Sequence, residues 1–163
     1  MSKPNRVSIP DVAPKAYQAM LHLEHAVEGL GLERPLYELI KIRASQINGC
    51  AFCIDMHTKD ARAGGETEQR IYALDAWRET PFFTERERAA LALTEAITLV
   101  TQGHVPDEVY AAAAVHFDEK ELGALVMAAV AINAWNRIAI SSRTPAGIYE
   151  PRQHAADTGA HAP

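Results

Sequence analysis

Apolar residues recur at intervals of three and four along most of the chain, which is the period of an amphipathic helix. The pattern first appears from Ala13 to Leu30 and returns over 35–48 and over 50–63. A glycine follows each of these stretches, and glycine often ends a helix because it adopts the left-handed conformation without strain. We therefore predict three helices in the first half of the chain, the second with Pro35 in its first turn.

Cap signals mark where helices begin in the second half of the chain. Thr84 is followed three residues later by Glu87, the spacing of a capping box, in which each side chain bonds the other residue's backbone N–H. Asp118 and Glu121 repeat this pattern. With a further cap at Thr67, the predicted elements are a helix over 67–76, a loop over 77–83, and helices over 84–101, 105–116 and 122–138.

The helix predicted over 122–138 is apolar on nearly every side. A helix on the surface would have a polar face, so we expect this one at the centre of a bundle or between subunits, which favours a homo-oligomer. No stretch alternates as a strand does. The fold class that we predict is all-α, a single-domain helical bundle of about six or seven helices.

Length and charge narrow the classes of protein. The chain has 163 residues, enough for one domain, a formal net charge of −5 and a sequence pI of about 5.8. This balance provides no basic surface for nucleic acid or for a membrane, so we expect neither partner. The first ten residues have no apolar signal core, which favours the cytoplasm. We expect an N-terminal arm over 1–10, the helical domain over 11–149 and a disordered tail over 150–163.

The chemistry is concentrated in one segment, where Cys50, Cys53 and His57 follow one another at helical spacing and share a face. Cysteines three apart in a helix are close enough to form a disulfide, so the pair can cycle between dithiol and disulfide. A helix N-terminus and a nearby imidazole each lower a thiol pKa. The first effect favours Cys50 as the thiolate and the second favours Cys53; we give weight to the base and predict that Cys53 attacks and Cys50 resolves.

Glu38 is a further candidate, twelve residues before Cys50 among apolar neighbours. A carboxylate facing the core needs hydrogen bonds, and His57 and a water near the thiols are its natural partners. Such a carboxylate would orient the imidazole and favour its charged form.

Together, Glu38, Cys50, Cys53 and His57 form the pattern E-x11-C-x2-C-x3-H, which resembles the active site of AhpD-like alkylhydroperoxidases in the carboxymuconolactone decarboxylase family. The resemblance covers about residues 15–140 and includes the later Ile-Asn-Ala-Trp-Asn-Arg segment, 132–137. One position departs from it: Phe52 stands where well-studied members have a second histidine, which makes the proton relay one group shorter.

The resemblance implies an all-helical trimer or hexamer that acts as a peroxidase. In that reading the second cysteine, Cys53, cleaves the peroxide O–O bond and becomes a sulfenic acid, and Cys50 condenses with it to a disulfide. Glu38 and His57, with a bound water, relay the proton. A dihydrolipoyl group or another dithiol protein, such as a thioredoxin-like one, reduces the disulfide, in some members on behalf of a peroxiredoxin partner. No cofactor and no metal is expected.

Four other interpretations remain open at this point. The cysteines could be buried structural thiols, or they could bind zinc, although Cys50, Cys53 and His57 supply only three ligands. The protein could instead be a cofactor-free decarboxylase or isomerase in which His57 and Glu38 move protons. It could also be a redox-sensing oligomer.

Two further groups of polar residues are given structural interpretations. The polar end of the last predicted helix is interpreted as satisfying buried backbone groups or a subunit contact; it consists of Asn133, Trp135, Asn136 and Arg137. Asp55 and Lys59 are interpreted as a solvated pair.

Overall fold

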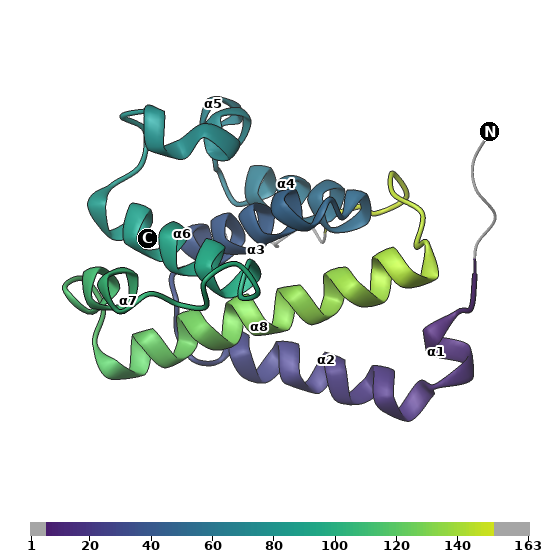
Figure 1. The fold of residues 1–163 in the computed structure, drawn as a ribbon. Helices are drawn as coiled ribbons and strands as arrows, with labels where there is room; N and C mark the ends of the chain where they lie inside the picture. Colours follow the sequence, from purple (N-terminus) through teal and green to yellow (C-terminus); the bar gives the residue numbers. More distant parts are fainter. Residues whose placement is uncertain (1–5, 152–163) are drawn as a thin grey trace, which may run out of the picture.

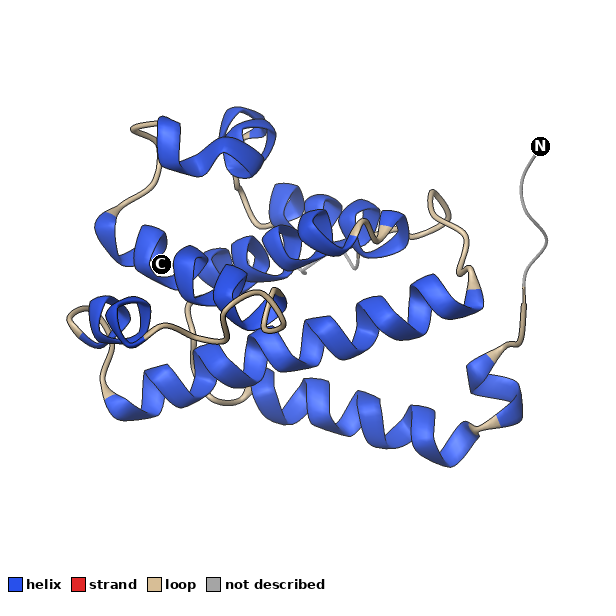
Figure 2. Ribbon diagram, in the orientation of Figure 1, coloured by secondary structure: helices blue, strands red, loops and turns tan. Residues whose placement is uncertain are grey.

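A computed structural model gives the structure of the protein and describes residues 6–151. Over these residues it contains eight α-helices and one 3₁₀-helix and no strand (Figure 2). In chain order the elements are α1 (Ile9–Val12), α2 (Pro14–Glu28), α3 (Arg34–Asn48), α4 (Ala51–Ala63), α5 (Glu68–Ala73), η1 (Leu74–Glu79), α6 (Glu85–Thr98), α7 (Asp107–Ala114) and α8 (Glu119–Ser142).

The all-α prediction is confirmed, with more helices than the expected six or seven. The seven predicted helices correspond to α2 through α8, and both capping boxes are formed, at Thr84 and at Asp118. The additions are α1, a single turn that begins in the segment expected to be an arm and ends in the predicted domain, and η1, which extends into the expected loop. Both are short, and periodicity identifies short elements poorly because they contain too few apolar residues.

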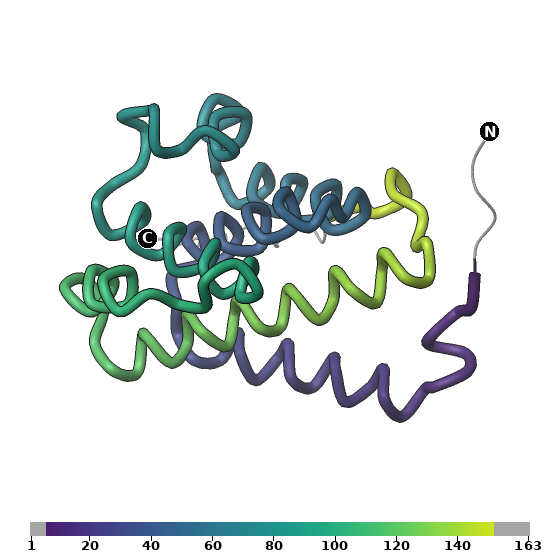
Figure 3. Tube along the Cα trace, in the orientation of Figure 1, coloured from purple at the N-terminus to yellow at the C-terminus, as the bar shows by residue number. Residues whose placement is uncertain are grey.

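The helix expected at the centre of the bundle is indeed central. In Figures 1 and 3, α8 runs between α2 on one side and α3 with α4 on the other. It contacts all three of these helices and also α6 and α7. Among the described residues, α8 is long and apolar enough to cross a membrane, but half of its most apolar window is buried in the fold, as in a core helix.

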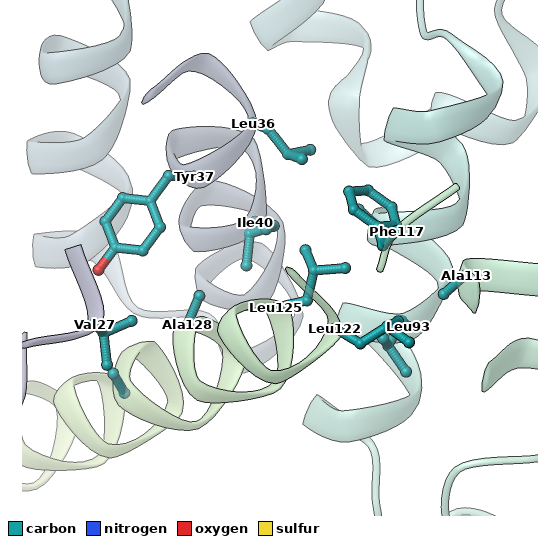
Figure 4. Close-up of a cluster of buried hydrophobic side chains, with 12 residues drawn as sticks. Val27, Leu36, Tyr37, Ile40, Leu93, Ala113, Phe117, Leu122, Leu125 and Ala128 are labelled. Carbon is teal, nitrogen blue, oxygen red and sulfur yellow. The ribbon is translucent and has the colours of Figure 1, made fainter. Parts of the chain in front are cut away.

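Helix α3 is buried along most of its length, where it packs against α4, α6 and α8. Its apolar side chains enter a core cluster with Leu125 and Ala128 of α8, and Figure 4 shows Tyr37 and Ile40 of α3 in this cluster. Two charged residues of α3, Glu38 and Lys41, are buried as well. Because a buried charge is costly without a partner, these two residues point to a specialised region.

The segment after α8 folds back over α4. Asp55 accepts hydrogen bonds from Lys59 Nζ at 3.1 Å and from the Gly147 backbone N–H at 3.0 Å, and Lys59 Nζ donates to the Tyr149 carbonyl at 2.8 Å. The interpretation of Asp55 and Lys59 as a solvated pair is therefore wrong, since the two residues hold a later part of the chain. Most of the tail predicted over 150–163 and the first half of the predicted arm lie outside the described residues.

Candidate active site

The two cysteines lie at the sharp turn between α3 and α4. Gly49 takes the left-handed conformation there, with φ of 67°, and ends α3. Cys50 is the N-cap residue of α4, and its backbone N–H bonds the Ser45 carbonyl at 2.9 Å. Cys53 is in the first turn of α4. Both thiols are free and buried, 1% and 2% exposed. The predicted stop at Asn48-Gly49 thus brings both sulfurs to the N-terminal end of a helix.

Glu38 and His57 meet as the sequence predicts. His57 Nδ1 lies 2.9 Å from Glu38 Oε2, which joins α3 to α4, and the two residues are 5% and 1% exposed. The other carboxylate oxygen, Oε1, forms an ion pair with Arg34 Nη2 at 2.8 Å. Burial raises the pKa of the Glu38 carboxyl, but the His57 hydrogen bond and the positive charges nearby outweigh burial and hold the pKa below its usual range.

The two thiols titrate as a pair. A hydrogen bond from the Cys53 thiol, together with the backbone N–H groups of Phe52 and Cys53, lowers the pKa of Cys50 to about 7 in spite of burial. The same S–H···S bond, burial and the charge on Cys50 raise the pKa of Cys53. The single negative charge of the pair therefore rests on Cys50, as the helix N-terminus favours, and not on Cys53 as the position of His57 suggests.

Asn136 of α8 is a site residue that sequence reasoning did not find. It is fully buried, and its side-chain amide lowers the pKa of both thiols. It is held by Ser45, to whose hydroxyl it donates at 3.0 Å, and by Asn48, whose amide donates to it at 2.8 Å. The sequence feature that could have identified Asn136 is its position in the polar segment 132–137, whose residues we interpret from the sequence as hydrogen-bonding buried backbone groups or forming a subunit contact.

A cavity of about 650 Å³ opens beside the thiols. Cys53, His57 and Glu38 line it, whereas Cys50 does not. Its volume suits a small organic molecule. We call it the thiol cavity. It is lined by Tyr17, Leu21, Glu24 and Glu28 of α2, Arg34, Glu38 and Lys41 of α3, Phe52, Cys53, Met56, His57 and Asp60 of α4, Trp135, Ile138, Ala139 and Ser142 of α8, and residues 6–10, 144, 145 and 149.

Asp60 also belongs to this region and was not predicted. It lies one turn after His57 on α4 and accepts a hydrogen bond from the Tyr149 hydroxyl at 2.7 Å. Glu38, His57 and Asp60 offer ligand atoms within 4.8 Å of one another, so they are the described residues best placed to hold a metal ion. Arg34 and His57 already pair with the Glu38 carboxylate, however, and this arrangement is better suited to moving a proton than to binding a cation.

Comparison with known sequences identifies the family. The model of the carboxymuconolactone decarboxylase family matches residues 14–96, about half of the chain. The chain belongs to this family. It is 51% identical over 136 residues to the uncharacterized protein YdfG of Bacillus subtilis (strain 168), which covers 83% of this chain and 92% of that protein. It is 31% identical over 91 residues to the uncharacterized YnjA of Escherichia coli (strain K12), 56% of this chain and 50% of that one.

Solved structures place the chain among the AhpD-like members of the family. ATU0492 of Agrobacterium tumefaciens, a protein of unknown function provisionally described as the antioxidant defence protein AhpD, is 40% identical with a TM-score of 0.87, over 90% of this chain and all of that one. The debrominase Bmp8, solved with 2,3,4-tribromopyrrole, shares the fold at 17% identity, with a TM-score of 0.73 over 83% and 73% of the chains. Because one fold can host different reactions, the reaction has to be inferred from the residues of the site.

Proposed function

We propose that the protein is a thiol peroxidase that reduces hydrogen peroxide or organic hydroperoxides. The Cys53 thiolate attacks the terminal oxygen of the hydroperoxide, so an S–O bond forms, the O–O bond breaks and the alkoxide leaves to become an alcohol. Cys53 is then a sulfenic acid. The Cys50 sulfur attacks it, and the disulfide forms as water departs. The two thiols lose two electrons, and the hydroperoxide becomes an alcohol and water.

The observation that supports this proposal is that the two sulfurs differ in their access to the cavity. Cys53 lines the thiol cavity, where a substrate can reach it, whereas Cys50 does not line the cavity and has the Cys53 side chain as its hydrogen-bond partner. A nucleophile needs access and a resolving thiol needs only its partner, which supports the assignment of attack to Cys53 and resolution to Cys50.

The proton on Cys53 has a short route within the pair. Because the resting charge is on Cys50, transfer of one proton along the S–H···S bond moves the charge to Cys53 without an external base. His57, oriented by Glu38 on the wall of the same cavity, is suited to protonate the departing alkoxide. The role of Glu38 and His57 in this proposal is therefore to move protons at the leaving oxygen.

The oxidised protein needs a reductant that supplies two electrons. We propose a dithiol for this step, such as a dihydrolipoyl group or a thioredoxin-like protein, because thiol exchange regenerates Cys50 and Cys53 and converts the donor to a disulfide. A peroxiredoxin is a further candidate partner. A reducing compartment such as the cytoplasm suits this cycle, and a homo-oligomer remains part of the proposal.

The test compares the two single-cysteine variants with cumene hydroperoxide and dihydrolipoamide. The parent protein is expected to turn over, and one equivalent of peroxide without reductant removes two hydrogens from the peptide that carries both sulfurs. Cys50→Ser is expected to consume one equivalent of peroxide, accept a sulfenic-acid label on Cys53 and then stop. Cys53→Ser is expected to consume none. Turnover by Cys53→Ser would refute the proposal.

A decarboxylase remains the second candidate because Glu38 and His57 form a buried acid–base pair on the wall of a cavity large enough for a carbonyl acid. That reaction would tolerate loss of either thiol and fail in His57→Gln. The peroxidase fails in Cys53→Ser. His22→Gln is the matched control for the histidine variant, since His22 is exposed and outside the cavity. This pair of variants separates the two functions.

A further inference from the structure

A buried ion pair on the wall of the thiol cavity has no role in the chemistry above. Lys41, on α3 and 3% exposed, donates to the Glu24 carboxylate of α2. The same carboxylate accepts hydrogen bonds from the Tyr37 hydroxyl at 2.9 Å and from the Trp135 indole N–H at 3.1 Å. Donors from α3 and α8 thus hold the carboxylate of α2 in place, and that carboxylate holds one ammonium.

Stability alone is a poor explanation for this arrangement. Taking two charges out of water costs several kcal/mol for each ion, and apolar residues of the same volume are often as stable as a buried pair. The Lys41 ammonium also lies 4.1 Å from the centre of the Tyr37 ring, a cation–π contact that limits its movement. The result is a positive charge held at one position on the cavity wall.

This charge and the reactive groups line the same cavity. Lys41 and Cys53 both line it, and the charge of Lys41 favours the ionised forms of Cys53 and of Glu38. The other cations of the cavity are less suited to the task, because Arg34 is half exposed and spans Glu28 and Glu38, and Arg6 is bound to the end of α8. Among the lysines and arginines that line the cavity, Lys41 is the one that is itself buried; His57, which is also buried, has its role in moving protons.

We propose that Lys41, clamped by Glu24, supplies a fixed positive charge on the wall of the cavity that Cys53 also lines, where it stabilises the Cys53 thiolate and the alkoxide released from a hydroperoxide. Lys41 acts through its field on Cys53, and Glu24 holds the ammonium in position while its own negative charge offsets part of that field. The part about the alkoxide rests on the proposed peroxidase function. The part about the thiolate does not, because a thiol ionises whether or not it meets a peroxide.

Other groups near Cys53 must be kept constant in any test. Cys50 is its hydrogen-bond partner, and α8 contributes only neutral groups to the lining. The other titratable and charged residues that line the cavity are Tyr17, Glu24 and Glu28 from α2, Arg34, Glu38 and Lys41 from α3, His57 and Asp60 from α4, and Arg6 and Tyr149 from the terminal segments. The test therefore changes Lys41 and Glu24 separately in a Cys50→Ser background, where Cys53 is the single thiol.

The experiment follows the ultraviolet absorbance of the Cys53 thiolate against pH in the absence of peroxide. Lys41→Met removes the charge and keeps an unbranched stem, and we expect it to raise the midpoint by about one pH unit. Glu24→Gln keeps a side-chain oxygen that can accept from the Lys41 ammonium, which the Tyr37 ring also holds, but removes the carboxylate charge that offsets it, so we expect the midpoint to fall. Lys41→Arg is expected to restore most of the parent midpoint. Lys120→Met, at an exposed position, is the control for loss of a lysine and is expected to change nothing.

Opposite shifts are the decisive result, since a residue with only a structural role would not move the midpoint in opposite directions in the two variants. Shifts of the same sign, or no shift in either variant, would overturn the proposal. If Lys41→Met does not fold, as circular dichroism would report, Glu24→Gln and Lys41→Arg still provide the test. In the protein with both cysteines, the rate of sulfenic-acid formation at neutral pH is expected to fall about tenfold in Lys41→Met. Opposite thiol shifts without any peroxide consumption would refute the peroxidase and leave the charge-setting role intact.

Discussion

The acidity of Cys50 gives the most direct test of the geometry at the thiols. Its pKa falls from an ordinary 9.0 to about 7, which corresponds to about 3 kcal/mol in favour of the thiolate. At pH 7 about half of the reduced molecules should then carry a thiolate, compared with about one in a hundred for an unperturbed thiol. The hydrogen bond from Cys53 is the largest contribution to this fall.

Cys53→Ala removes that bond and leaves the backbone N–H groups and Asn136 in place. We expect the pKa of Cys50 to rise by about one pH unit, so that the thiolate at pH 7 falls from about half to about a tenth. Thiolate absorbance of the reduced protein against pH measures both states. In the parent protein one equivalent should ionise near pH 7, and the second should stay protonated well above pH 9 because the pKa of Cys53 is raised. Two equivalents that titrate together, or an unmoved midpoint in Cys53→Ala, would refute the reasoning.

Two further predictions concern stability. Because folding lowers the pKa of Cys50, the unfolded chain binds more protons between about pH 7 and 9, and urea unfolding of the reduced protein should show stability that rises by about 1–2 kcal/mol across this window and is lost as the pH falls through 7. Above about pH 9 the raised pKa of Cys53 acts in the opposite direction. Cys50→Ser should flatten this rise, and a profile that stays the same in the variant would contradict the assignment. Leu39→Ala in the core should cost about 2–5 kcal/mol in the same measurement because Leu39 is fully buried. Val115→Ala, at a position 79% exposed, should change stability by less than about 0.5 kcal/mol; equal losses in the two variants would show that Leu39 is not in the core.

Local signals in the sequence predicted most of the helices because the forces that begin and end a helix are local. The two capping boxes and the left-handed Gly49 depend on residues only a few positions apart, and each is found where predicted. The meeting of Glu38 with His57 was predicted for a different reason. A carboxylate among apolar neighbours needs a hydrogen-bond partner if it faces the core, and His57 was the nearby side chain able to serve as one.

The residues that sequence reasoning missed depend on contacts between distant parts of the chain. Lys41 looks like a surface residue until Glu24, from a different helix, makes its burial possible. Asn136 reaches the thiols only because α8 crosses the start of α4, and Tyr149 reaches Asp60 because the segment after α8 folds back. Nothing in the local pattern encodes these contacts.

The sequence by itself determined the helices and the cysteine pair, because spacing of three or four residues acts within one helix. It also predicted the Glu38–His57 contact between two helices, because a buried charge requires a partner. The tertiary structure alone decided which sulfur is ionised, which one faces the cavity, and what else surrounds them. These properties depend on burial and on the electric field of groups that only packing brings together.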